Sequence, residues 1–209
     1  LGALSRVTVM LELGIVPVYV FDGPPPAVKA DTIADRQAAR DNGRALVIPR
    51  EAFDEVKHLI QLMGVTCVQS PGEGEAQCAW YSMADHIDAV ATEDIDCLVF
   101  GAKFMIRGLN ATAKTVTLID RAAVLAGFGL TDAEFVDLAI LMGCDYTVER
   151  PSVGPARALR LMREYHSIEA IFAAGELVDP EEFDYVAARA EFANPTGITD
   201  DLGDITPTP

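Results

Sequence analysis

The sequence is poor in cysteine and has no long apolar run, and both shortages exclude classes of protein. Its four cysteines lie scattered at Cys67, Cys78, Cys97 and Cys144, a pattern that fits neither a zinc site nor a disulfide framework and favours reduced thiols in a core. No apolar run approaches the roughly 18 residues that a membrane-spanning helix needs. We therefore expect a soluble protein from inside the cell, without contact to a membrane.

Basic residues are also scarce. Sixteen lysines and arginines face 32 acidic residues, which gives a formal net charge of -16. Such a balance argues against a nucleic acid or another polyanion as partner unless basic side chains gather locally. The 209 residues are 50% hydrophobic, which is enough for one sizeable core. Disorder is thereby excluded as the main state.

Strand and helix patterns alternate along the first two thirds of the chain. The run VPVYVF at 16–21 is uniformly apolar, which predicts a strand buried in a parallel sheet. Further patterns predict helices at 3–13 and 50–63, strands at 65–69 and in IDAVAT, and a hairpin around Asn110. From Thr131 onward the patterns are helical, beginning with a Thr131–Glu134 capping box. The alternation is typical of an α/β sheet.

Acidic residues follow the predicted strands directly. Asp22 comes after VPVYVF, Glu73 and Glu75 come after VTCVQ, and Asp94 and Asp96 come after DAVAT. Because the carboxyl ends of parallel strands share one edge of a sheet, these side chains are expected to converge there. In so acidic a chain, a single pair of this kind is more often solvated surface, but these acids lie directly against apolar strand runs.

Converging carboxylates repel one another unless cations compensate them. Oxygen ligands without a nearby histidine or cysteine favour Mg²⁺ or Mn²⁺, and the three histidines of the chain lie outside these acidic clusters. Two such ions could clamp a phosphodiester, one activating water and the other stabilising the leaving oxygen. The residues thus predict phosphodiester hydrolysis.

Four motifs carry a resemblance to a known family: PVYVFDGPPPAVK, SPGEGEAQCAW, ATEDIDCLVFG, and FVDLAILMGCDY followed by SVGPARALRLM. In these motifs the sequence resembles the flap endonucleases, within the structure-specific 5′ nucleases that include the xeroderma pigmentosum group G nuclease. The resemblance implies a PIN-like α/β core with a mostly parallel central sheet flanked by helices at 1–142. It further implies a shortened helical arch at 23–52 and a helix-hairpin-helix type DNA-binding region at 143–209.

The resemblance also implies roles for single residues. Lys29 and Arg36 match a basic pair that contacts the scissile phosphate, and the hairpin residues Ser152 and Gly154, with Arg157, match DNA-binding positions. A local basic patch would comprise Lys29, Arg36, Lys103, Arg107, Lys114, Arg157, Arg160 and Arg163. The metal site would comprise Asp22, Glu73, Glu75, Asp94, Asp96 and Asp145.

The sequence departs from the family in several places. A further metal-binding aspartate of the family has no counterpart before Asp22, which suggests a truncated or impaired chain, and Ser152 stands where the hairpin has glycine. A sliding clamp would be reached only through a C-terminal segment beyond this sequence. The implied activity is two-metal cleavage of 5′ flaps in branched DNA, in the nucleus of a eukaryote or otherwise in the cytoplasm. The alternatives are a 5′ exonuclease, a junction resolvase or a non-catalytic DNA-binding scaffold.

Overall fold

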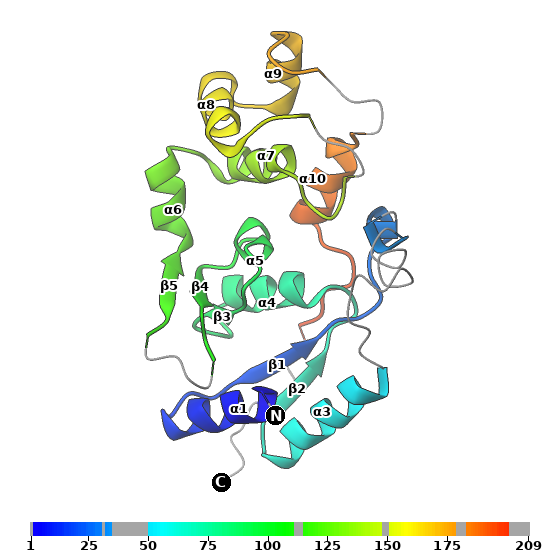
Figure 1. The fold of residues 1–209 in the computed structure, drawn as a ribbon, viewed down its shortest axis with the longest axis vertical. Coiled ribbons are helices and arrows are strands. Elements are labelled where there is room, and N and C mark those ends of the chain that lie inside the picture. Colours follow the sequence, from blue (N-terminus) through cyan, green and yellow to red (C-terminus); the bar gives the residue numbers. More distant parts are fainter. Residues whose placement is uncertain are drawn as a thin grey trace.

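A computed structural model describes residues 2–30, 32–34, 50–110, 115–147, 151–178 and 183–200 (Figure 1). The strands are β1 (Val18–Phe21), β2 (Thr66–Gln69), β3 (Val90–Ala91), β4 (Phe104–Arg107) and β5 (Thr117–Asp120). The helices of the described residues are α1 (Gly2–Glu12), the 3₁₀ helix η1 (Ala27–Lys29), α3 (Arg50–Leu62), α4 (Gly74–Met83), α5 (Asp96–Val99), α6 (Arg121–Phe128), α7 (Asp132–Met142), α8 (Pro155–Tyr165), α9 (Ile168–Ala173) and α10 (Tyr185–Ala193).

The strands form two small sheets. β1 pairs in parallel with β2, and β3 pairs in parallel with β4, which also forms the predicted antiparallel hairpin with β5. The mainly parallel pairing confirms the α/β class. The expectation that the 16–21 strand is buried is wrong, because all four residues of β1 are only half-buried. Within the described residues β1 pairs with β2 alone, so one of its edges lacks a strand neighbour.

Local sequence signals set the ends of the helices. Thr131 caps α7, its side chain accepting from the backbone of Glu134 while the Glu134 carboxylate accepts from the Thr131 backbone. This is the predicted capping box. At the other end Gly143 stops the helix with φ +104°, a conformation that L side chains rarely adopt. The helix therefore ends at Met142, three positions before Asp145, which leaves Asp145 in a turn.

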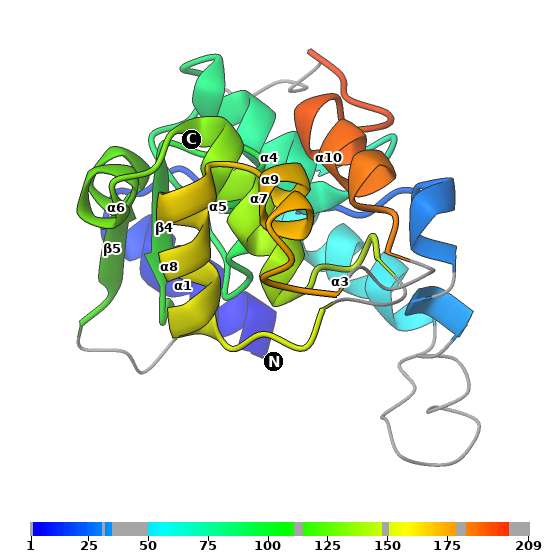
Figure 2. The ribbon, with the colours of Figure 1, turned by 90° about the horizontal axis from the view of Figure 1, so that it is seen from above.

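The elements stack along the long axis of the molecule. In Figure 1, β1 and β2 lie with α1 and α3 at one end, α4 and α5 lie in the middle, and α7–α10 form the other end. The larger core cluster joins the middle layer to these last helices, and a smaller one lies between α1, α3 and the first sheet. Seen from above in Figure 2, α7, α8 and α9 lie over the middle of the molecule.

The described residues bear on membrane-spanning helices and on cysteine pairing. Within them, no helix combines the length and the apolar character that crossing a bilayer requires. All four cysteines are free, although Cys97 alone is fully buried and the other three are half-buried. Burial raises the pKa of the Cys78 and Cys97 thiols to about 12, so both stay protonated at neutral pH.

Candidate metal and catalytic site

The carboxyl ends of β1 and β2 meet at one edge, because Phe21 lies opposite Gln69 in the parallel register. Asp22 follows β1 at this edge. Its Oδ1 accepts a hydrogen bond of 2.7 Å from the backbone N–H of Gly74, the first residue of α4. A Cβ at Gly74 would lie 2.9 Å from that same oxygen, so glycine allows the carboxylate to approach the helix. The first strand and the start of α4 are thereby joined.

Glu73 and Glu75 flank this contact. Glu73 is the N-cap of α4, and Glu75 lies in its first turn, where the unpaired backbone N–H groups favour negative charge. Both side chains are half-buried. This is the placement that the Gly and Pro residues around them predict.

Asp94 lies in the turn between β3 and α5, and Asp96 lies at the start of α5. Oδ1 of Asp94 accepts from the backbone N–H of Asp96 at 3.1 Å, and the N–H of Asp94 donates to Thr92 Oγ1 at 3.1 Å. Asp96 begins α5, a short helix where the sequence predicts a loop leading into a short apolar element. The strand before them is shorter than IDAVAT predicts, since only Val90–Ala91 pair.

Asp145 reaches the same region from the turn after α7. Its carboxylate lies 2.9 Å from Nζ of Lys29, and its backbone oxygen accepts from Thr32 Oγ1 at 2.8 Å. Lys29 also pairs with Oε1 of Glu73. An ammonium ion thus lies between two of the predicted metal-site carboxylates, and its side chain is only 15% exposed.

Lys29 ends the 3₁₀ helix η1, and its side chain contacts two of the carboxylates. The expectation that Lys29 and Arg36, seven residues apart, share one face of a helix is not tested by the described residues. Arg36 lies outside the described residues. Their joint contact with a phosphate stays a prediction.

Electrostatics show that the acids share one environment. Burial, followed by the charges of Asp94 and Asp145, raises the pKa of Asp96 to about 6. Burial and the charge of Asp22 raise the pKa of Glu75. Burial and mutual repulsion of the acids thus both disfavour their ionised forms.

Lys29 provides part of that compensation. Burial alone lowers its pKa, but the hydrogen bonds to Glu73 and Asp145 outweigh burial, so the net shift is upward and the amine stays charged. Six carboxylates against one ammonium still leave an excess of negative charge. Their oxygen-only donor set fits a hard divalent cation. As the side chains now lie, however, no three Asp, Glu, His or Cys residues of the described segments are arranged to hold a single ion.

Tyr146 contacts two residues of the site, although the sequence pattern predicts no role for it. Its hydroxyl donates to Oε2 of Glu73, and the residue is 3% exposed. The ring also lies beneath Lys29, with 5.8 Å between Nζ and the ring centroid. The motif GCDY contains this tyrosine, but nothing in the motif indicates that its hydroxyl reaches Glu73 while its ring packs in the core.

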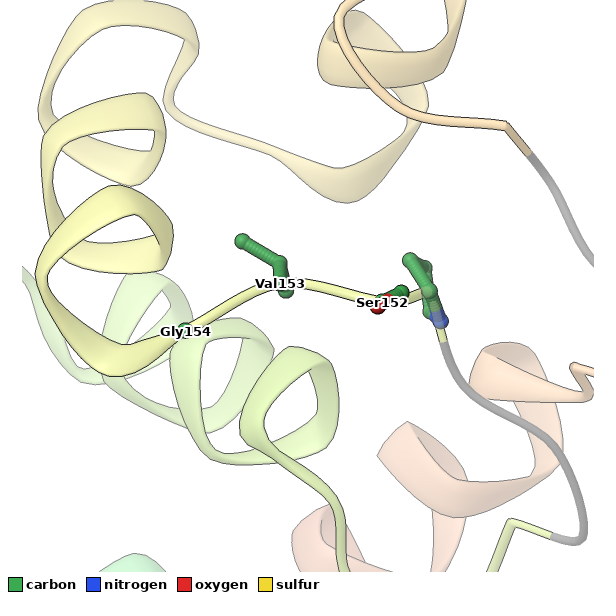
Figure 3. A pocket seen from close by; sticks show the side chains of 4 residues that line it. Ser152, Val153 and Gly154 are labelled. Carbon is green, nitrogen blue, oxygen red and sulfur yellow. The ribbon is translucent and has the colours of Figure 1, made fainter.

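The predicted hairpin residues line a separate pocket. Pro151, Ser152, Val153 and Gly154 border it just before α8, and Gly154 is the N-cap of that helix (Figure 3). Arg157, in the first turn, donates to the backbone oxygen of Glu176 at 2.6 Å. Contact of this region with DNA stays a prediction.

The predicted basic patch is largely paired within the protein. Of its described members besides Lys29, all bond to acidic side chains or to backbone carbonyls: Lys103 to Asp85, Arg107 to Glu93, Arg157 to Glu176, Arg160 to Glu164, and Arg163 to Gly127 and Phe128. Arg36 and Lys114 lie outside the described residues. Exposed ion pairs are weak, so these basic side chains can leave their acidic partners for another anionic group.

Two family profiles match the chain. The XPG N-terminal domain matches residues 1–43, and the XPG I-region matches residues 64–145. Flap endonuclease 1 of Glossina morsitans morsitans is 40% identical over 225 aligned positions, which cover 93% of this chain and 58% of that protein. Flap endonuclease 1 of Leishmania braziliensis is 40% identical over 222 positions, covering 93% and 56%. The chain thus spans little more than half the length of these relatives.

Solved structures agree with this relationship. Flap endonuclease-1 from Methanococcus jannaschii matches with a TM-score of 0.76 and 27% identity, covering 96% of this chain and 69% of that one. The catalytic core of Rad2, solved with a DNA substrate, matches with a TM-score of 0.80 at 23% identity, covering 96% and 72%, and so supports the fold alone. Fold and acidic edge together define the PIN-like nuclease class. Within that class, the chain belongs to the XPG family, the family of the flap endonucleases.

Proposed function

We propose that this chain carries the catalytic region of a structure-specific 5′ nuclease that hydrolyses phosphodiester bonds in flapped or branched DNA. The observation that carries the proposal is the gathering of carboxylates and Lys29 at the carboxyl ends of the strands, in a chain of the XPG family. The whole protein would act in DNA replication or repair, in the nucleus of a eukaryote or the cytoplasm of another cell.

The acidic residues would hold the metal. Two Mg²⁺ ions, or Mn²⁺ in their place, would when bound activate water and stabilise the leaving oxygen of the phosphodiester. The ligands from this chain would be Asp22, Glu73, Glu75, Asp94, Asp96 and Asp145. The raised pKa values of Asp96 and Glu75 support this role. Ionised carboxylates gathered in one place are unfavourable unless cations bind among them.

Lys29 and Arg36 would bind the scissile phosphate. Lys29 already presents a charged amine to two acceptor oxygens in the site, and a phosphate oxygen is an equivalent acceptor. When DNA enters, the ammonium would exchange a carboxylate for the phosphate. The step orients the substrate and leaves the carboxylates free for cations.

The rest of the chain would position the DNA. The region 143–209 would form the helix-hairpin-helix type element, with Ser152, Gly154 and Arg157 at the DNA backbone, and the segment 23–52 would form a short gateway beside the core at 1–142. A sliding clamp would be bound only through a segment C-terminal to this sequence. Helix N-termini such as that of α8 are suited to phosphate groups.

Cleavage of a labelled 5′-flap duplex tests the proposal. We expect Mg²⁺-dependent cutting that EDTA abolishes and that Asp94→Asn lowers by more than about 100-fold, because losing a ligand exceeds the 10–100-fold cost of losing an outer contact. Glu93→Gln is the matched control, since Glu93 accepts from the Gly108 N–H at 2.8 Å and faces Arg107 rather than the cluster. Equal cutting by wild type and Asp94→Asn would contradict the assignment.

A DNA-binding scaffold is the second candidate. It is favoured by the absence, among the described segments, of three acids arranged around one ion. Binding of flapped DNA without cleavage under any divalent ion would support it. Nicked, gapped and four-way junction substrates in the same assay separate flap cleavage from exonuclease or resolvase activity.

A further inference from the structure

Both carboxylate oxygens of Glu73 are engaged by the protein itself. Oε1 pairs with the ammonium of Lys29, and Oε2 accepts the hydroxyl proton of Tyr146. A glutamate side chain has three rotatable bonds, so a carboxylate fixed at both oxygens is far more restricted than a solvated one. The orientation of Glu73 is therefore set by side chains from outside α4.

The tyrosine is itself held in place by aromatic side chains. Its ring makes edge contacts with Phe100 at a centroid distance of 6.3 Å and with Phe192 at 5.0 Å, and these two rings lie 4.9 Å apart. Phe192 belongs to α10 and is 4% exposed. The hydroxyl is thus aimed from a packed aromatic cluster that includes the last helix.

The backbone around Glu73 is held by the segment that follows α10, residues 194–200, called the strap below. Gln77 is fully buried, and its amide donates to the Thr199 oxygen at 2.8 Å and accepts from the Thr199 N–H at 2.9 Å. At Gly72, a Cβ would come within 2.1 Å of the Thr196 oxygen. The strap therefore closes directly over the turn that carries Glu73, and Figure 1 shows it returning from α10 toward β1.

The strap is also anchored to α10 at its start. The N–H of Thr196 donates to Glu191 at 2.8 Å, and the Thr196 hydroxyl donates to the same carboxylate at 3.0 Å. The helical C-terminal part thus reaches Glu73 by two routes. One passes from Phe192 through Tyr146 to the carboxylate, and the other passes through the strap to the backbone.

We propose that Tyr146 is a positioning residue that orients Glu73 for cation binding, and that the docked α10 and strap maintain this orientation. The proposal rests on the proposed function, since it takes Glu73 as a metal ligand. Because the neutral hydroxyl of Tyr146 occupies Oε2, Oε1 would be the oxygen that binds a cation once the ammonium of Lys29 leaves it. Partners of this kind that orient a ligand commonly change metal affinity 10–100-fold when removed.

The donor is a buried phenol. Burial, and then the hydrogen bond to Glu73, raise the pKa of Tyr146 well above its ordinary value. The rigid, packed ring fixes the direction in which this hydroxyl donates, and that geometry carries the proposal.

Binding of Mn²⁺ to the 209-residue chain without DNA, followed by electron paramagnetic resonance or calorimetry, tests the proposal. We expect Tyr146→Phe to bind Mn²⁺ about tenfold more weakly than wild type while its thermal unfolding stays cooperative. Tyr165→Phe is the matched control, because it removes a tyrosine hydroxyl beside a glutamate, Glu164, in α8 and outside the acidic site. Unchanged Mn²⁺ affinity in Tyr146→Phe would overturn the proposal.

A double-mutant cycle with Glu73→Gln separates positioning from general stability. If Tyr146 acts through Glu73, adding Tyr146→Phe to Glu73→Gln produces no further loss of affinity. An equal loss in both backgrounds would show a merely structural role and overturn the proposal. Phe192→Leu provides a second route that keeps the hydroxyl, with an expected loss of a few-fold that also vanishes in the Glu73→Gln background.

The same titration distinguishes the two levels of inference. A wild-type chain that binds no Mn²⁺ would overturn the metal-dependent function together with the role of Tyr146. A wild-type chain that binds Mn²⁺ as tightly as Tyr146→Phe does would leave the function intact and overturn the positioning role alone.

Discussion

The ammonium of Lys29 lies 2.9 Å from Oδ2 of Asp145, and it also pairs with Glu73. A lysine from the segment after β1 thus joins a carboxylate at the start of α4 to one in the turn after α7. The acidic site carries an internal counter-ion. Under the proposed function, binding of a metal ion and binding of a phosphate would both require release of this amine from a carboxylate.

Replacing Lys29 by Met should destabilise the chain without metal. Removal of the ammonium leaves Glu73 and Asp145 facing each other uncompensated in a half-buried place, for which we expect a loss of about 1–3 kcal/mol in the free energy of unfolding. Because a divalent ion restores the missing charge, Mg²⁺ should raise the melting temperature more in the variant than in wild type. Thermal unfolding with EDTA and with excess Mg²⁺ measures both effects.

Lys57→Met is the control for this comparison. Lys57 donates a hydrogen bond to Gln69 at 3.1 Å, and its Nζ lies 5.3 Å from the centroid of the Phe21 ring. The Lys57→Met variant therefore loses a hydrogen bond and a ring contact, as the Lys29 variant does, but no contact to a carboxylate of the site. Its response to Mg²⁺ should equal that of wild type. An equal response in the Lys29 variant would mean that the amine does not compete with cations.

The capping box of α7 predicts a pH dependence of stability. The Thr131 backbone N–H, at 2.6 Å from Oε2, and His166, at 2.5 Å from Oε1, lower the pKa of Glu134. A lowered carboxyl pKa contributes stability above the usual value near 4.5, and this contribution is lost as the pH falls through the folded-state pKa. Glu134→Gln should therefore be less stable than wild type at pH 7, by about 1 kcal/mol, and this difference should shrink as the pH falls below about 4.5.

Urea unfolding at pH 7, 5 and 3 checks this difference between the two proteins. Glu164→Gln is the control, since Glu164 forms an exposed pair with Arg160 at 3.0 Å and should change stability by less than about 0.5 kcal/mol. A constant difference between wild type and Glu134→Gln across the pH range would contradict the charge-based explanation.

Gly72→Ala should disturb the strap. The added Cβ would meet the backbone oxygen of Thr196 at 2.1 Å, so strap or turn must move, and we expect a destabilisation of about 1–3 kcal/mol. Gly127→Ala, in α6 with no atom within 4 Å of its Cβ, should instead be neutral or stabilising by up to about 1 kcal/mol. Urea unfolding of both variants tests the contrast, and equal stabilities would mean that the strap is not packed on this turn.

The local features of the fold were predictable because their signals lie within a few residues of one another. The capping box of Thr131 and Glu134 and the stop at Gly143 set the ends of α7 as predicted. The hairpin of β4 and β5 also forms where the pattern places it. The burial of β1 was predicted wrongly, because apolar character alone does not show how many neighbours a strand has.

What the sequence by itself determined is the order of strands and helices and the placing of acids just after strands, since hydrophobic periodicity, caps and turns act over short stretches of chain. Only the tertiary structure decided that Lys29 lies among these acids, that Tyr146 donates a hydrogen bond to Glu73, and that the Gln77 amide forms hydrogen bonds with the Thr199 backbone. Lys29 and Glu73 are 44 positions apart in the sequence, Tyr146 and Glu73 are 73 apart, and Gln77 and Thr199 are 122 apart. Contacts at such separations arise from the packing of whole elements, which no local pattern encodes.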